Sequence, residues 1–584
     1  MEAQTGGELI AKMLVAEGVE TVFGIIDGTY VQMIAGLKKH GIRLVTPRHE
    51  TSAAHMAGAY ARLTGKLGVC IASNGPGVAN ILPGLVTENG EGNRVLVITS
   101  WRRRGIINPD RGGTFQYFDQ VAAIKPIAKW SGAADGFGRI PEIMRRAFRI
   151  SHQGRPGVVH VTVPEDVINS PGQETIAPLT SPENYRAVEP VRASSEQIRR
   201  AADMLGNANM PMIQAGSGVL HAGASAELAV LAEYLQVPVT TSWGGRSCID
   251  ERRAVSIPLM HTEMVDKIRN ESDVVLALGT RFGETEWWGK APYWARPDKQ
   301  DVIHVDCDGE VLGLNRPVQL GILADVKAFL SDLIAELQSR KLDRSGSSQQ
   351  ARVEGYHKAK TENGEAAIMF MSAVDVPLHT FQIPVICQEI FDDDAIVVID
   401  GGNTAVWGSS FHQIRTPGAH LMTYKFGMLG AGVGQALGAR IACPDRQVYV
   451  IIGDGAMGFH MQEIETAVRN DLPVIFLVVA DKQWGMVKFS QGMALNPEGM
   501  MTARILPPKE TINTDLGETA WDKLAESMGA HGERVGKADD LKPALERALK
   551  SGKCAVIHLD VDPVEHIWAP GFDTFKAMHN EPAG

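Results

Sequence analysis

Buried strands and amphipathic helices alternate along three stretches of the chain, which are separated by polar segments. Short runs of β-branched and aliphatic residues, such as residues 67–73 (LGVCIAS) and 472–480 (LPVIFLVVA), recur with helical patterns between them. Apolar runs this dense suit the middle of a parallel sheet that is covered on both faces. The repeated strand and helix order therefore predicts α/β domains with doubly wound parallel sheets.

Polar stretches divide this pattern into domains. Residues 169–184 (NSPGQETIAPLTSPEN) are rich in Pro and Ser and are interpreted as a linker. Residues 339–365 are rich in charged and small polar side chains and separate the second domain from the third. We predict an N-terminal domain, a central Rossmann-like domain, a third domain and a C-terminal tail, with the bounds 1–175, 190–342, 373–563 and 564–584. The aromatic and cationic residues of the tail either close over a site as a lid or pack on a neighbour.

Composition narrows the class of partner. The net charge of −11 argues against nucleic acid or an anionic membrane, because those surfaces attract an excess of Lys and Arg. The six cysteines are widely spaced without a CxxC pair, so neither a disulfide framework nor a zinc site is indicated. The sequence shows no signal peptide and no apolar run near the roughly 20 residues that span a bilayer. We expect a cytoplasmic enzyme that acts on small molecules.

Two carboxylates of the third domain mark the first candidate site. Residues 449–459 (YVIIGDGAMGF) place Asp454 where a strand ends and a helix begins, and Asp481 ends the next strand, 27 residues later (481 − 454). Parallel strands bring such residues to one edge of the sheet, where α/β proteins bind ligands. Helix-start N–H groups bind phosphate, and Mg²⁺ commonly joins carboxylates to phosphates. On these residues alone, the motif is a tight turn or a site, and Asp481 is a solvated loop residue or a ligand.

The GDG motif, with an oxygen ligand at the end of the following strand, resembles the cofactor motif of thiamine-diphosphate-dependent enzymes. The resemblance implies that Asp454, Asp481 and the backbone carbonyl of Gln483 hold Mg²⁺ on thiamine diphosphate. It also implies that the diphosphate meets the backbone of Gly453, Gly455 and Ala456. This family usually has Asn where the present chain has Asp481, and it often has a second Asn where the chain has Ala480. Asp is an oxygen donor with the same reach, so we expect metal binding to be retained.

A glutamate of the first domain extends the resemblance. Glu50 closes the sequence RHE at the start of an Ala-rich helix, a position where an isolated Glu is often only a helix cap. In the family, a glutamate after such a strand activates the cofactor by sharing a proton with its aminopyrimidine ring. The resemblance therefore implies a catalytic role for Glu50, whereas Arg48 and His49 are interpreted as structural.

Two further segments of the third domain match the family. Residues 424–439 (YKFGMLGAGVGQALGA) have the glycine spacing of a closely packed helix, and the resemblance adds that Gly427 and Leu429 contact the aminopyrimidine. Leu429 would be the apolar wedge that bends the cofactor. Residues 400–407 (DGGNTAVW) resemble the segment that meets the diphosphate, which implies Gly402, Asn403 and Thr404 as cofactor-binding residues. The motifs keep the family order over nearly the whole chain, so the resemblance implies that the first domain is pyrimidine-binding and the third is diphosphate- and Mg-binding.

The branch of the family is argued from shorter matches. Residues 453–474, together with the segments GGNT and FGII, are similar to the branch of 2-hydroxyacyl-CoA lyase and oxalyl-CoA decarboxylase. We therefore predict cleavage of a 2-hydroxyacyl-CoA to formyl-CoA and an aldehyde or ketone. The reverse reaction would be a carboligation. Residues 483–489 (QWGMVKF) instead resemble acetolactate synthase, so a 2-oxoacid decarboxylase or carboligase is the alternative. A non-catalytic cofactor-binding paralogue is the second alternative, and Asp481 is its main support.

The remaining expectations concern the substrate, a second nucleotide and assembly. Gln116 occupies the place where this group puts a polar side chain against the substrate, so we predict a catalytic role for it. The central domain would receive the ADP part of CoA at Gly216, Ser217 and Arg281. An FAD site is not expected, because residues 280–289 (TRFGETEWWG) depart from the usual FAD-contacting pattern. The resemblance implies a homodimer or homotetramer with active sites between chains.

Overall fold

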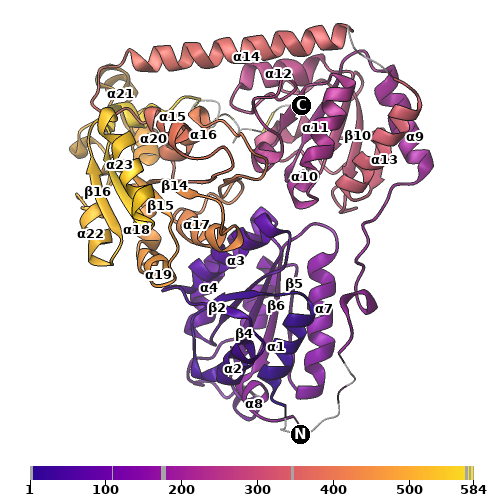
Figure 1. The fold of residues 1–584 in the computed structure, drawn as a ribbon, viewed down its shortest axis with the longest axis vertical. Helices are drawn as coiled ribbons and strands as arrows, with labels where there is room; N and C mark the ends of the chain where they lie inside the picture. Colours follow the sequence, from indigo (N-terminus) through magenta and orange to yellow (C-terminus); the bar gives the residue numbers. More distant parts are fainter. Residues whose placement is uncertain are drawn as a thin grey trace.

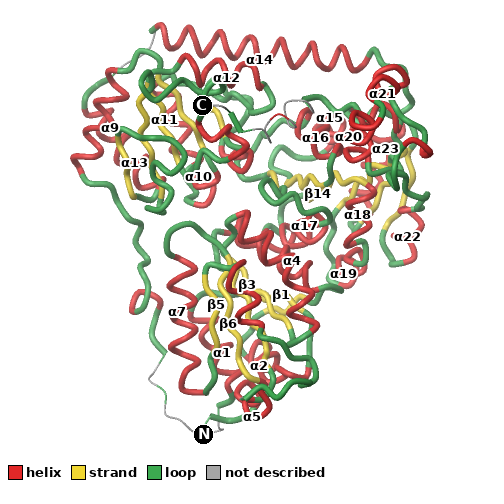
Figure 2. The backbone as a smooth tube through the Cα atoms, turned by 180° about the vertical axis from the view of Figure 1, so that it is seen from behind, coloured by secondary structure: helices red, strands yellow, loops and turns green. Residues whose placement is uncertain are grey.

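The computed structural model describes residues 4–107, 109–172, 176, 179–342, 347–571, 577 and 581–582. The chain forms three lobes, and each lobe is built on one sheet whose strands all pair in parallel (Figure 1). Helices lie outside the strands in each lobe (Figure 2). The prediction of three doubly wound α/β domains is therefore confirmed. The three sheets lie within the predicted ranges, and the domain boundaries themselves stay a prediction.

The first sheet has the strand order β2-β1-β3-β4-β6-β5. Its strands are β1 (Thr21–Gly24), β2 (Arg43–Val45), β3 (Gly68–Ala72), β4 (Val95–Trp101), β5 (Trp130–Ala133) and β6 (Val158–Pro164). Its helices are α1 (Gly6–Ala16), α2 (Val31–Lys39), α3 (Glu50–Thr64), α4 (Pro76–Glu91), α5 (Arg104–Ile107), α6 (Gln120–Ile124), α7 (Ile140–His152) and α8 (Glu165–Asn169). The central strands β3 and β6 are buried along their whole length, because helices cover both faces of the sheet.

The central sheet has the order β11-β10-β9-β7-β8. Its strands are β7 (Pro211–Ala215), β8 (Val239–Thr241), β9 (Val274–Leu278), β10 (Asp301–Asp306) and β11 (Leu320–Leu323). Its helices are α9 (Ser195–Asn207), α10 (Ser217–His221), α11 (Ser225–Leu235), α12 (Thr262–Glu271) and α13 (Val326–Ser339). A capping box between Ser194 and Gln197 fixes the start of α9, the first helix after the linker.

The third sheet has the order β13-β12-β14-β15-β17-β16. Its strands are β12 (Ile396–Asp400), β13 (His420–Leu421), β14 (Val448–Gly453), β15 (Ile475–Ala480), β16 (His531–Val535) and β17 (Ala555–Asp560). Its helices are α15 (Gln382–Ile390), α16 (Asn403–Phe411), α17 (Ala431–Ala442), α18 (Asp454–His460), α19 (Glu463–Arg469), α20 (Gly485–Leu495), α21 (Pro497–Ala503), α22 (Trp521–Ser527), α23 (Ala538–Ser551) and α24 (Pro563–Ile567).

Most of the polar stretch that separates the central domain from the third lies in a helix. Helix α14 (Ser348–Ser372) runs from the central lobe to the third lobe along one side of the molecule (Figure 1). Its many Ala, Glu, Lys and Gln residues favour helix without an apolar stripe. Lys360 anchors it, because its buried ammonium donates to the carbonyls of Glu251, Arg253 and Ser256 at 2.8, 3.0 and 2.9 Å.

Among the residues that the structure describes, no helix has the length and apolar character needed to cross a membrane. The predicted tail begins within α24, and the rest of its proposed lid lies mostly outside the described residues.

Helices α3 and α17 join the first domain to the third and share one hydrophobic core (Figure 1). Glycines make the close approach possible, as the spacing in residues 424–439 predicted. A Cβ atom added to Gly434 would lie 2.8 Å from Cβ of His55, and one added to Gly438 would lie 2.7 Å from Cα of Met56. Any side chain at these two positions would push the helices apart.

We therefore expect Gly438→Ala to lower the free energy of unfolding by about 1–3 kcal/mol, the usual cost of overpacking a rigid contact. The added methyl group meets backbone atoms of Met56, which cannot rotate away. Urea unfolding monitored by circular dichroism measures the change. Gly355→Ala in α14 is the matched control: a Cβ atom there meets nothing within 4 Å, so helix propensity should raise stability slightly. Equal effects of the two substitutions would contradict the packing argument.

Candidate active site

Three neighbouring strands of the third sheet end at one edge and deliver the predicted cofactor residues there. Strands β12, β14 and β15 are adjacent, with Asp400 paired to Ile452 and Gly453 paired to Val479. The loop after β12 starts α16 at Asn403, the loop after β14 starts α18 at Asp454, and Asp481 follows β15 directly. The adjacency inferred from the 27-residue spacing is thus present in the fold.

Asp454 and Asp481 form a buried acidic pair. Asp454 accepts the N–H of Gly455 at 2.8 Å and the N–H of Lys482 at 2.9 Å, one on each oxygen. Asp481 is buried (7% exposed), and its Oδ2 has no hydrogen-bond partner in the described structure. Burial, followed by the charge of Asp481, raises the pKa of Asp454 to about 7, and burial raises the pKa of Asp481 to about 7. This pair lacks a positive partner.

The start of α16 faces the same pair. Both polar atoms of the Asn403 side chain are buried and without a partner in the described residues. A Cβ atom on Gly485, at the start of α20, would lie 2.9 Å from Oδ2 of Asp481 and 3.0 Å from Nδ2 of Asn403. Unpaired amide and carboxylate groups therefore converge beside Gly485. Buried polar groups are normally satisfied, so this convergence is the arrangement expected of a ligand site.

The other diphosphate candidates surround this point. Gly402 caps α16, and Thr404 lies one residue inside the helix, where a Cβ atom on Gly453 would approach its Oγ1 to 3.0 Å. A Cβ atom on Gly455 would lie 2.6 Å from the ring of Trp484, so only glycine fits between this turn and the indole. Ala456 follows in the first turn of α18 and is buried.

Gln483 lies next to the acidic pair and is also buried. An isolated bridge pairs Gln483 with Asp515, and the bonds beside it come from its neighbours: Trp484 N–H donates to Thr514, and Leu516 N–H donates to Lys482. Neither of these two bonds involves the carbonyl of Gln483. Within the described part of the chain, no group of three or more His, Cys, Asp or Glu residues is placed to hold a metal. A metal here would depend on two carboxylates and neutral oxygens.

His566 is a site residue that sequence reasoning missed. It lies on α24, in the segment assigned to the tail, yet Nε2 is 3.4 Å from Oγ1 of Thr404 and 3.9 Å from Oδ2 of Asp481. Its Nδ1 pairs with Oγ1 of Thr380 at 2.8 Å, and burial lowers the pKa of His566 to about 3, so the ring is neutral. Asp562 and Pro563, just after the last strand, are a helix-start signal in the sequence. This signal could have predicted α24, the helix that carries His566.

Glu50 begins α3 and is 8% exposed. Its Oε2 accepts Nδ2 of Asn80 at 3.0 Å, and no described hydrogen bond or ion pair joins it to Asp454 or Asp481. The segment around it packs on the third domain: the N–H of Arg48 donates to both oxygens of Glu463 at 3.0 and 3.1 Å. The first and third domains are in contact within one chain, and the hydrogen bond described for the Glu50 carboxylate stays within the first domain.

The remaining predicted residues lie on loops. Gly427 is exposed and left-handed (φ 63°), and Leu429 packs against the shared core beneath α17. Gln116 is exposed and left-handed (φ 53°), and its carbonyl accepts Nδ2 of Asn74 at 2.9 Å. Its side chain is free to meet a ligand or another chain, and no contact within the described chain joins it to Asp454.

The nucleotide candidates lie at the edge of the central sheet. Gly216 packs against the backbone of Gly279, so the packing alone explains why this residue is small. Ser217 starts α10. Arg281 lies after β9 near Arg155 of the first domain and Lys425 of the third. Burial, followed by the charge of Arg281, lowers the pKa of Lys425 to about 8 and also lowers the pKa of Arg155. Cations from three domains thus gather at this edge.

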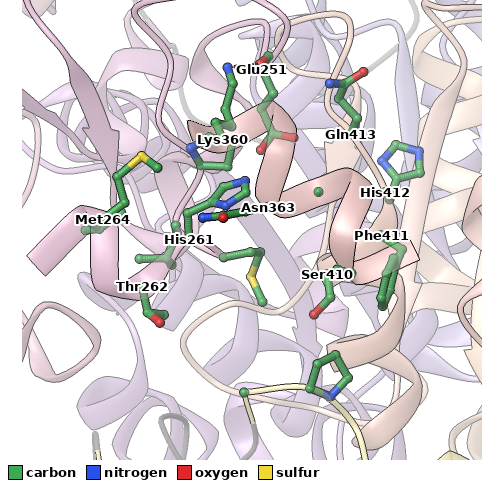
Figure 3. Close-up of a pocket in the computed structure, with 18 of the residues that line it drawn as sticks. Glu251, His261, Thr262, Met264, Lys360, Asn363, Ser410, Phe411, His412 and Gln413 are labelled. Carbon is green, nitrogen blue, oxygen red and sulfur yellow. Dashed lines mark hydrogen bonds between the residues drawn. The ribbon is translucent and has the colours of Figure 1, made fainter. Parts of the chain in front are cut away.

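A further cavity lies elsewhere, between the central and third domains. It has a volume of about 820 Å³ and is lined by residues of α12, α14 and α15 and by the C-terminal end of α16. Figure 3 shows Lys360 and Asn363 on one side of it and Ser410 to Gln413 on another. None of the predicted cofactor residues lines this cavity. A smaller cavity, of about 430 Å³, is lined by Asp454, Gly455 and Trp484 among others.

Comparison with known proteins gives three matches to one family. The N-terminal TPP binding domain of thiamine pyrophosphate enzymes matches residues 4–123, the central domain of these enzymes matches 198–333, and their C-terminal TPP binding domain matches 400–559. The acetolactate synthase large subunit of Cyanidium caldarium is 30% identical over 97% of this chain and 95% of its own length. The probable acetolactate synthase large subunit of Methanococcus aeolicus is 29% identical over 96% and 92%, respectively.

Proposed function

We propose that this chain, which belongs to the thiamine pyrophosphate enzyme family, is a decarboxylating carboligase that joins 2-oxoacids in the manner of acetolactate synthase. The relatives support this alternative better than the 2-hydroxyacyl-CoA lyase predicted from short motifs, because those compared are named acetolactate synthases. The observation that carries the proposal is the convergence of the unpaired Asp481 carboxylate and Asn403 amide beside the GDG turn.

The residues present fit thiamine diphosphate with Mg²⁺. Asp454, Asp481 and the carbonyl of Gln483 would hold the cation, which would relieve the repulsion between the two buried carboxylates. Gly453, Gly455 and Ala456, with Gly402 to Thr404, would place backbone N–H groups and small side chains against the diphosphate oxygens. A cation and an anion together would satisfy the polar atoms that the described chain leaves unpaired.

The chain's own groups then have separate tasks. When bound, thiamine diphosphate supplies a carbanion centre that attacks and stabilises an acyl group. Leu429 would hold the aminopyrimidine side of the site in place, and Glu50 would hold and return a proton at its carboxylate. Gln116 would orient a polar group of the substrate through its side-chain amide. Trp484 and the buried, neutral His566 would help to keep water from the metal side of the site.

The enzymes of this family act on small molecules and are oligomeric. Glu50 and the acidic pair lie on different domains, and the hydrogen bond described for the Glu50 carboxylate stays within the first domain, which supports an active site completed by a second copy, with the first domain of one copy facing the third domain of the other. A homodimer is the smallest assembly that satisfies this arrangement, and a homotetramer is a pair of such dimers. The exposure of Gln116 in the single chain agrees with the same proposal.

The cations Arg155, Arg281 and Lys425 support an anionic ligand at the edge of the central sheet. We propose an adenine nucleotide diphosphate there, whether it belongs to CoA, ADP or FAD. The shared feature of these three molecules is the diphosphate, which carries the charge that a cluster of cations attracts. Mass spectrometry of ligands released from the native protein would distinguish them.

We expect the purified chain, supplied with thiamine diphosphate and Mg²⁺, to convert pyruvate to acetolactate and CO₂. The same preparation should release no formyl-CoA from a 2-hydroxyacyl-CoA. Coupled detection of CO₂ and chromatography of acyl-CoA esters measure the two reactions side by side. Formyl-CoA without acetolactate would reverse the choice between the two branches. Cofactor binding without either product would favour the non-catalytic paralogue.

A further inference from the structure

The acidic pair of the third domain has an excess of negative charge that no neighbouring side chain neutralises directly. The ammonium of Lys482 points away, to Glu518 at 2.8 Å and Asp560 at 3.6 Å. Lys488, on the first turn of α20, is buried and pairs with Asp515 at 2.7 Å. The neutral ring of His566 supplies no charge. Among the described side chains, those nearest the pair are thus engaged elsewhere or uncharged.

The acidic pair already presents carboxylate oxygens that could coordinate a cation. Each oxygen of Asp454 is fixed by one backbone N–H and keeps a second lone pair free. Oδ2 of Asp481 and Nδ2 of Asn403 are buried, unpaired and lie around the same point beside Gly485. Strands β14 and β15 are adjacent and place Asp454 and Asp481 at one edge of the sheet, so both carboxylates are in position before any diphosphate arrives.

We propose that a divalent cation binds the acidic pair, Asp454 and Asp481, without the diphosphate, and that this loading prepares the site for the cofactor. The inference rests on the proposed function, because the cation is the one assigned to thiamine diphosphate. Two carboxylates neutralise a divalent cation, whereas a single carboxylate would leave a net positive charge that only the diphosphate could balance. Asp481 therefore supplies the charge that makes loading independent of the cofactor.

Lys488 has a definite part in this arrangement. Its buried ammonium acts on Asp481 through space, while its hydrogen bond goes to Asp515. Since it bonds neither carboxylate of the pair in the described structure, its influence on a bound cation is repulsive. Removal of this charge should tighten cation binding in the absence of diphosphate, the opposite of what a merely structural loss would produce.

Titration of the cofactor-free full-length protein with Mn²⁺, followed by the electron paramagnetic resonance signal of the free ion, tests the proposal. We expect the wild-type chain to bind about one Mn²⁺ per chain without thiamine diphosphate. Asp481→Asn should weaken this binding roughly tenfold or more, and Lys488→Met should strengthen it. Asp298→Asn, an exposed carboxylate of the central domain paired with Arg296, is the matched control and should change nothing.

The outcomes separate this inference from the function on which it rests. Wild-type protein that binds Mn²⁺ only when thiamine diphosphate is added would overturn the inference and leave the proposed cofactor site intact. Equal binding by wild type and Asp481→Asn would also overturn it. Absence of Mn²⁺ binding even with thiamine diphosphate would overturn the proposed function as well. If Asp481→Asn does not fold, the sign of the change in Lys488→Met decides, because only the electrostatic role predicts tighter binding.

Discussion

Replacement of Glu50 by Gln should lower the turnover number by about 10²–10⁴-fold under saturating thiamine diphosphate and Mg²⁺, the range that a lost proton-transfer group typically costs. Gln has the same shape and can still accept the hydrogen bond from Asn80, so the fold of the first domain and the start of α3 should remain intact. It cannot hold and return a proton. Steady-state kinetics with pyruvate measures the loss, and fluorescence titration of thiamine diphosphate should show binding close to that of the wild type.

The matched control is Glu142→Gln, the same substitution on an exposed helix of the same domain. Glu142 forms a surface ion pair with Arg139 at 2.6 Å and lies at the start of α7. Its turnover should equal that of the wild type. Near-normal turnover in Glu50→Gln would show that the carboxylate is not the group that handles the proton, and would leave Glu50 as a buried helix-start residue.

Replacement of Glu251 by Gln should lower the free energy of unfolding by about 3–5 kcal/mol, the usual cost of breaking one partner of a buried ion pair. Arg246 and Glu251 are 5% and 3% exposed, and Nε of Arg246 lies 2.8 Å from Oε1 of Glu251. Arg246 also donates to the carbonyls of Ser409 and His412, and Glu251 accepts the N–H of Ile414 at 2.7 Å. The pair thus ties the central domain to the third, and its loss leaves a buried guanidinium without a counter-charge.

Differential scanning calorimetry and urea unfolding measure this change. The double variant Arg246→Met/Glu251→Leu should be much less destabilised than Glu251→Gln, because it removes both charges instead of stranding one. Glu142→Gln again serves as the exposed control and should cost about 0–1 kcal/mol. Equal destabilisation by Glu251→Gln and Glu142→Gln would mean that the buried pair does not secure the interface.

Much of the site could be located from the sequence because strand ends are encoded locally. The apolar runs that end at Gly453 and Ala480 identify two buried strands, and the 27 residues between Asp454 and Asp481 admit one crossover helix. Parallel topology then places both carboxylates at one edge. The fold class follows from the same pattern, whereas the roles of these residues as ligands stay predictions.

Other features depend on contacts between distant segments, which no local pattern encodes. His566 reaches Thr404 and Asp481 across more than eighty residues of sequence, because β17 lies beside β15 and delivers α24 to the same edge. The polar composition of residues 339–365 marked only a separation between domains, and the contacts of Lys360 with three carbonyls of the central domain appear only in the tertiary structure. Short motifs also favoured acyl-CoA chemistry, whereas similarity over nearly the full chain is to proteins named acetolactate synthase.

The sequence by itself determined the three parallel sheets, the glycine-lined crossing of α17 and the pairing of two carboxylates at a sheet edge. Each follows from hydrophobic period, strand length and residue size, which act over a few dozen neighbouring residues. Only the tertiary structure decided which polar atoms remain unpaired beside Gly485 and where Lys482 and Lys488 direct their charges. It also decided that the Glu50 carboxylate accepts a hydrogen bond from Asn80. These features depend on how distant segments pack, because the burial of a polar atom and the charges around it are set by segments that are far away in the sequence.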